Sequence, residues 1–149
     1  FPDEEHGKPL AKAVFYGDYF RWDPVKHTKF VKKLGWSELK EAPAGSFSKT
    51  ENCDMKYIDV REHIKFLKFG YGRATDQLNI EIRSKKITRQ DALQVALELD
   101  GKMSSHHKSE FCEYLAISMA EFDKVVDDFV NRDIFEKTNA GWKYKIERT

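Results

Sequence analysis

The segment from Lys65 to Asp76 constrains the fold of this chain more than any other part of the sequence. Its two glycines, Gly70 and Gly72, end one helical pattern and stand directly before another. Glycine lets the backbone turn sharply or approach a ligand closely, and Arg73 adds a planar guanidinium that suits phosphate or carboxylate. The segment therefore predicts one of two things. Either Gly70 is a left-handed helix C-cap followed by a solvated Arg73, or the turn is an anion site.

The chain of 149 residues is long enough for one domain with a real core, and its 34% of charged residues is ordinary for a globular protein. It has no apolar run of about twenty residues and no N-terminal signal-peptide stretch, so we expect no membrane span. Because it begins at Phe1, we expect a piece of a longer protein. Two cysteines, Cys53 and Cys112, are too few for a disulfide scaffold and stand in contexts typical of buried or helical positions. They favour a reducing compartment, the cytoplasm.

The near balance of charge hides an asymmetry along the chain. From Arg61 to Arg89 there are eight Lys or Arg against three acids, whereas Glu110 to Glu136 holds eight acids against two cations. The middle of the chain is therefore expected to attract anions, and the C-terminal third to repel them.

Periodicity predicts a mainly α protein, a multi-helix domain with at most a small C-terminal β-hairpin. Residues 1–23 form an irregular aromatic arm, and a helical domain follows over residues 24–149. The arm ends in a cluster that is more typical of a covered interface than of a ligand site: Phe15, Tyr16, Tyr19, Phe20 and Trp22.

Local signals place the individual helices. Asp23-Pro24 starts a short helix that ends before Gly35. A loop over residues 36–51, which holds Pro43, Gly45 and four Ser or Thr, is predicted to be the most mobile. Apolar residues at spacings of three and four predict a helix over about 54–68. For residues 77–83 the pattern favours a helix, capped by Thr75 or Asp76, over a strand. Thr88 caps a helix that ends at Asp100-Gly101.

The C-terminal third is predicted to hold two helices, over about 106–116 and 119–131, the second opened by a Ser118–Glu121 capping box. Strands over 134–137 and 142–146 would then form a hairpin. This order of elements also fits a winged helix-turn-helix. A recognition helix should be basic, but this one carries four acids against Lys124, which argues against nucleic-acid binding.

The residues offer no catalytic group that we can assign. No nucleophile stands beside a base, and there is no phosphate loop of the Walker type. His63 has no evident partner and is predicted to lie on the solvated surface. His106, His107 and Cys112 match a zinc site only weakly, so no metal is predicted.

Several segments together resemble the C-terminal part of N-acetyl sugar amidotransferases of bacterial surface-polysaccharide biosynthesis. The resemblance runs from about residue 13 to Trp142. It is carried by residues 16–23, the Phe-Gly-Tyr-Gly-Arg-Ala-Thr-Asp run of 69–76, Ile82-Arg83, residues 87–92 and Asp100-Gly101. The chain departs from the family at Ser84-Lys85-Lys86, where a glycine-containing turn is expected, and at Phe135, where tryptophan is usual.

The resemblance implies an ATP-dependent reaction that converts the acetamido group of a nucleotide-linked sugar to an acetamidino group. ATP with Mg would bind an upstream nucleotide-binding domain, whose Ser-Gly-Gly loop does not occur here, and a separate glutaminase would supply ammonia. This chain would be the substrate-facing part, inactive alone. Its predicted substrate-binding residues are Lys68, Gly70, Tyr71, Gly72, Arg73, Thr75, Asp76, Arg83 and Arg89. The alternative is a protein-interaction or structural helical module, in which the acidic helices or the aromatic arm dock the glutaminase or the upstream domain.

Overall fold

A computed structural model describes residues 12–139 and 141–145 of the chain. These residues fall into two compact units, which divide between Ser37 and Glu38. The arm predicted for residues 1–23 lies partly outside the described residues, and its described part belongs to the first unit. The boundary predicted at residues 23 and 24 falls inside that unit.

The first unit holds a short 3-10 helix, Tyr16–Asp18, and the helix α1, Pro24–Lys33. The predicted N-cap of α1 is confirmed, because the Asp23 carboxylate accepts hydrogen bonds from the backbone N–H groups of Val25 and Lys26 at 3.1 and 3.2 Å. Neither helix contains a buried residue.

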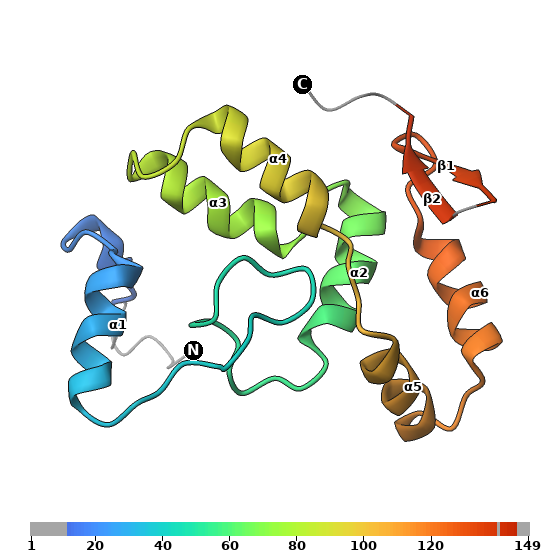
Figure 1. The fold of residues 1–149 in the computed structure, drawn as a ribbon, viewed down its shortest axis with the longest axis horizontal. Helices are drawn as coiled ribbons and strands as arrows, with labels where there is room; N and C mark the ends of the chain where they lie inside the picture. The colour runs from blue at the N-terminus through green and yellow to red at the C-terminus, as the bar shows by residue number, and fades with distance from the viewer. Residues whose placement is uncertain (1–11, 140, 146–149) are drawn as a thin grey trace, which may run out of the picture. The chain divides into compact units, whose positions relative to one another are not determined.

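The second unit is mainly helical, as predicted (Figure 1). Its helices are α2 (Ile58–Phe69), α3 (Arg73–Arg83), α4 (Arg89–Leu99), α5 (Ser105–Tyr114) and α6 (Met119–Phe129). The strands β1 (Phe135–Thr138) and β2 (Gly141–Tyr144) pair antiparallel, with Phe135 opposite Tyr144. The predicted hairpin is thereby confirmed.

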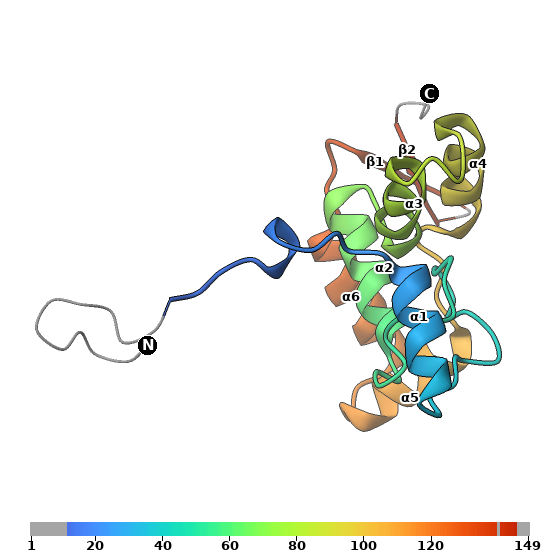
Figure 2. The same cartoon turned by 90° about the vertical axis from the view of Figure 1, so that its left-hand side faces the viewer.

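Two clusters of buried side chains hold this unit together. The larger one joins α2, α5, α6 and the hairpin through Val60, Leu67, Cys112, Phe122, Val126, Val130 and Phe135. The smaller one lies between α3 and α4, which pack side by side in both views (Figures 1 and 2), and consists of Ala74, Leu78, Ala92 and Ala96. Small residues at this contact let the two helices approach closely.

Helix α3 settles the choice between helix and strand at residues 77–83 in favour of the helix. The predicted caps Thr75 and Asp76 are wrong, because α3 starts earlier, after Gly72. Helix α2 also starts later than predicted, at Ile58, since Asn52 takes a positive φ of 54° and the following residues form turns. Lys85 has a φ of 58°, the left-handed conformation that a glycine would favour in this turn.

Three further expectations are corrected by the packing of this unit. His63 is half-buried rather than solvated, because its Nδ1 lies 2.6 Å from the carbonyl oxygen of Gly101. Cys53 is exposed in a turn, and only Cys112 is buried as expected. Part of the loop expected to be most mobile is anchored, since Gly45 and Ser46 are buried and the Gly45 carbonyl accepts from Ala74 N at 3.1 Å.

Candidate functional site

The predicted substrate residues begin at the end of α2, where Gly70 is the C-cap. Its φ of 80° lies in the left-handed region, and its N–H donates to the Phe66 carbonyl at 2.8 Å. The Tyr144 hydroxyl donates to the Gly70 carbonyl at 2.6 Å. The C-cap interpretation of Gly70 is therefore confirmed, and the hairpin fixes the turn that leads into α3.

The N-terminus of α3 is bound by a carboxylate from another part of the chain. The carboxylate of Asp100 accepts hydrogen bonds from Thr75 N at 3.2 Å and from Thr75 Oγ1 at 2.5 Å. A Cβ atom on Gly72 would lie only 2.7 Å from Asp100 Oδ1. Gly72 therefore makes room for Asp100, whose carboxylate satisfies the Thr75 N–H and is favoured by the positive end of the helix dipole.

Arg73 points to a carboxylate of the preceding loop. Its guanidinium forms an ion pair with Glu51, whose Oε2 also accepts from Gln77 Nε2 at 3.0 Å. Gln77 is buried, and its Oε1 accepts from the N–H groups of Phe47 and Ser48 at 2.7 and 3.1 Å. Arg73 is thus part of a network that fastens the loop to α3.

Asp76 and Tyr71 surround Lys65 of α2. The Lys65 ammonium pairs with Asp76, lies 3.2 Å from Glu62 Oε2 and sits 4.7 Å from the centre of the Tyr71 ring. Burial alone would lower the pKa of Lys65, but the hydrogen bond to Asp76 and the charges of both carboxylates raise it above its ordinary value. The ammonium therefore stays charged and links α2 to α3.

The remaining predicted cations are spread out. Lys68 lies over the rings of Phe69 and Phe129, 5.3 and 5.8 Å from their centres, and so beside α6. Arg73 and Arg83 are the first and last residues of α3. At the usual helical rise this separates their backbones by about 15 Å. The four arginine and lysine side chains expected to gather at one helix start do not form a single cluster.

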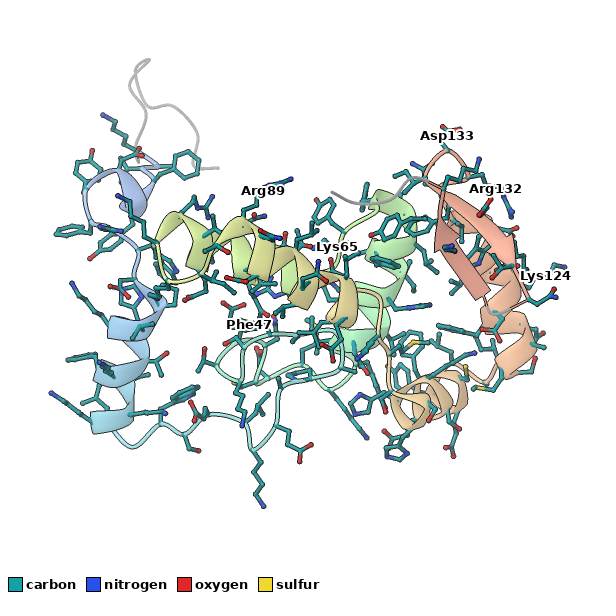
Figure 3. The ribbon with its side chains drawn as sticks, turned by 45° about the horizontal axis from the view of Figure 1, so that its top comes forward. Phe47, Lys65, Arg89, Lys124, Arg132 and Asp133 are labelled. Carbon is teal, nitrogen blue, oxygen red and sulfur yellow. The ribbon has the colours of Figure 1, made fainter. Side chains whose placement is uncertain are left out.

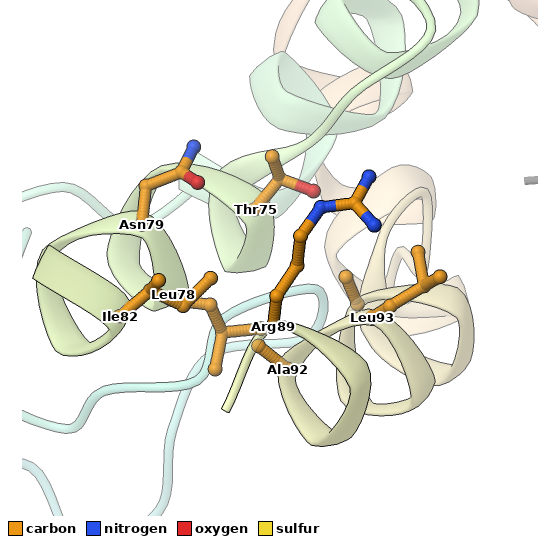
Figure 4. A pocket seen from close by; sticks show the side chains of 8 residues that line it. Thr75, Leu78, Asn79, Ile82, Arg89, Ala92 and Leu93 are labelled. Carbon is orange, nitrogen blue, oxygen red and sulfur yellow. The ribbon is translucent and has the colours of Figure 1, made fainter. Parts of the chain in front are cut away.

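Two of the predicted residues do share a pocket, which we call the α3–α4 pocket. It has a volume of about 130 Å³, and its polar lining consists of Thr75 and Asn79 from α3 and Arg89 from α4. Figure 4 shows the Arg89 guanidinium turned to the same side as the Thr75 hydroxyl. The arrangement offers the Arg89 guanidinium and the Asn79 amide to one small anionic or polar group, whereas the proton of the Thr75 hydroxyl is donated to Asp100.

The comparison with known families decides what kind of chain this is. A model of the family described as LPS biosynthesis protein WbpG-like, C-terminal domain, matches residues 44–148, which is more than half of the chain. The chain belongs to this family. Among curated proteins, none matches the sequence.

The matched span coincides with the second structural unit except for the first few residues of that unit. The WbpG-like domain therefore contains both buried clusters and the α3–α4 pocket. Within the described residues no helix is long and apolar enough to cross a membrane. Over the same residues, no group of three or more His, Cys, Asp or Glu side chains is placed to hold a metal ion.

Sequence reasoning missed Asn79, Asp100 and Glu51 as parts of this region. Asn79 could have been found, because it stands four residues after Thr75 and so lies on the same face of α3. Asp100 and Glu51 could not, since no local pattern indicates that residues so distant in sequence meet Thr75 and Arg73.

Proposed function

We propose that this chain is the substrate-facing, C-terminal domain of an ATP-dependent amidotransferase of surface-polysaccharide biosynthesis. The enzyme would convert an acetamido group on a nucleotide-linked sugar to an acetamidino group. Membership of a lipopolysaccharide-biosynthesis family supports the pathway, and the sequence resemblance supports the reaction.

The activation of the amide by ATP would take place in another domain. An amide oxygen is a poor leaving group, so ATP with Mg, bound by an upstream domain, would adenylylate it with release of pyrophosphate. Ammonia from a separate glutaminase would then attack the carbon, and AMP would leave with the former amide oxygen. The whole reaction would take place in the cytoplasm without nucleic acid. The acidic face of α6, with Glu121, Asp123 and Asp128 exposed, supports the absence of nucleic-acid binding.

The part left to this chain is to bind the nucleotide sugar, and one observation carries it. The α3–α4 pocket brings together Thr75 and Arg89, two residues selected from the sequence alone. Pockets for whole ligands usually measure about 300–1,000 Å³. The α3–α4 pocket is smaller, which suits a single phosphate of the diphosphate. We therefore place Arg89 first among the predicted cations, because it lines this pocket.

The test is the change Arg89→Gln in the complete enzyme. Loss of a charge-assisted contact costs about 1.5–3 kcal/mol, so the KM for the nucleotide sugar should rise about ten- to a hundredfold. Lys124→Gln, on the exposed face of α6 away from Arg89 (Figure 3), is the matched loss of one positive charge and should leave KM unchanged. Equal KM values for the Arg89 variant and the wild type would remove Arg89 from the substrate site.

A further inference from the structure

A second and larger pocket lies in the loop before α2, and none of the predicted substrate residues lines it. It has a volume of about 420 Å³ and is bordered by residues between Leu39 and Ile58 together with His107 of α5. We call it the His107 pocket. Its size falls in the range of about 300–1,000 Å³ that is usual for small-molecule sites.

A buried carboxylate holds His107 at the edge of this pocket. Asp59 of α2 is completely buried, and its Oδ2 accepts from Ser104 N at 2.8 Å, at the N-cap of α5. Its Oδ1 lies 2.9 Å from His107 Nδ1. The Asp59 carboxyl group therefore lies at the N-terminus of α5, where backbone N–H groups and the helix dipole attract negative charge.

This contact fixes which ring nitrogen of His107 is available. An ionised carboxylate can only accept hydrogen bonds, so Nδ1 carries the proton and donates it to Asp59. In the neutral ring, Nε2 then has a lone pair and is an acceptor. The His107 side chain remains 30% exposed, so the ring is accessible from the pocket that it lines.

The charges around the pocket do not suit a phosphate. Glu41 and Asp54 contribute two carboxylates, and Asn52 contributes an amide. The one ammonium, that of Lys56, donates to Glu110 Oε1 at 2.8 Å. Carboxylate and amide groups both form hydrogen bonds with hydroxyls, and the carboxylates repel a free anion.

Part of the lining is apolar. Leu39, Pro43, Met55 and Ile58 supply aliphatic surface next to the polar groups. A sugar ring has the matching character, since its C–H face is apolar and its hydroxyls both donate and accept hydrogen bonds.

We propose that the His107 pocket is a binding site for a neutral sugar ring. In it, His107 Nε2 accepts a hydrogen bond from a sugar hydroxyl, and Asp59 is the positioning residue that sets the tautomer of the ring. This site is separate from the α3–α4 pocket, and the choice of an N-acetyl sugar as its probe rests on the function proposed above.

Cys53 provides a reporter for occupancy, because this exposed thiol lines the pocket whereas Cys112 is buried. The chain is treated with iodoacetamide in the presence of N-acetylglucosamine, and the modification of each cysteine is followed by mass spectrometry. N-acetylglucosamine should slow the alkylation of Cys53 in a saturable way, and inorganic phosphate at the same concentration should not. Absence of protection, or equal protection by phosphate, would overturn the proposal.

Two histidine variants then test the role of the ring. His107→Gln should weaken the protection of Cys53 by about three- to tenfold in concentration, as expected for one lost hydrogen bond. His106→Gln changes the neighbouring histidine, which is 76% exposed and does not line the pocket, and should leave the protection unchanged. Equal protection in both variants would contradict the role of His107.

The positioning role of Asp59 has a readout that needs no variant. In wild-type protein at pH about 8, long-range ¹H–¹⁵N correlation spectra should show His107 protonated at Nδ1 and not at Nε2. N-acetylglucosamine should then shift the Nε2 resonance. In Asp59→Asn the Nδ1 preference should weaken, if that variant folds. A wild-type ring protonated at Nε2 would overturn the role given to Asp59.

Discussion

Gly72 stands at a position where a side chain would collide with Asp100. Its backbone, with φ of −111° and ψ of −164°, is one that alanine adopts without strain. A Cβ atom would instead lie 2.7 Å from Asp100 Oδ1 and push the carboxylate away from Thr75. A glycine that looked like a ligand contact in the sequence is therefore also required by the packing of the protein itself.

We expect Gly72→Ala to lower the free energy of unfolding by about 1–2 kcal/mol, the value of a lost helix cap. Urea unfolding followed by circular dichroism measures this difference. Gly17→Ala is the matched control, because a Cβ atom on Gly17 would meet nothing within 4 Å. A Gly72 variant as stable as the wild type would show that Asp100 does not cap α3 in solution.

His63 predicts a pH dependence of stability. Burial is the main cause that lowers the pKa of His63 below its ordinary value of 6.5, although the hydrogen bond with Gly101 opposes the shift. The unfolded chain therefore binds a proton more readily than the folded one. The stabilisation is fully present above pH 6.5 and is lost as the pH falls through the folded pKa.

Replacing His63 by Gln should flatten the decline of unfolding free energy between pH about 7.5 and about 5.5, a window that lies above most carboxylate titrations. The slopes of the unfolding free energy against pH are compared, rather than the free energies themselves, because the variant also loses packing contacts. His106→Gln, at a well-exposed position, should retain the wild-type slope. Parallel slopes in the wild type and the His63 variant would show that His63 titrates equally in both states.

At the scale of elements, helix starts were predictable where the cap is local. Asp23, Thr88 and Ser118 each bond a backbone N–H two or three residues ahead, so a short sequence window contains the whole interaction. Helix α3 was misplaced because its cap comes from Asp100, far along the chain. The spacing of residues along the sequence predicts structure within one helix or strand. A cap that comes from a distant part of the chain depends on how the helices pack, and no local spacing indicates it.

The same limit explains what could be predicted of the candidate site. Residues of the Lys65 to Asp76 segment were selected because cations and glycines recur there, which is a local property. Their partners were not, since Glu51 meets Arg73 and Gln77 through a loop that carries no regular pattern. The sequence therefore indicates a local excess of positive charge that would attract anions. It does not indicate that a carboxylate of the protein itself pairs with Arg73.

At the scale of the whole molecule, the two units differ in what they bury. The described helices of the first unit contain no buried residue, whereas the second unit contains both buried clusters and the whole family match. Within the second unit, the loop before α2 is fastened to α3 by Gln77 and by the Gly45 carbonyl. The loop is therefore part of the folding unit.

We expect a chain of residues 38–149 to unfold cooperatively at the same urea concentration as the full chain. A chain of residues 52–149 should be less stable by about 2–4 kcal/mol. It loses Glu51 and the N–H groups of Phe47 and Ser48, which leaves the buried Gln77 amide without partners. A chain of residues 24–149 separates the two possible boundaries. If it is more stable than residues 38–149, α1 belongs to the helical domain, as the boundary at residue 24 predicts; equal stability places the boundary after residue 37.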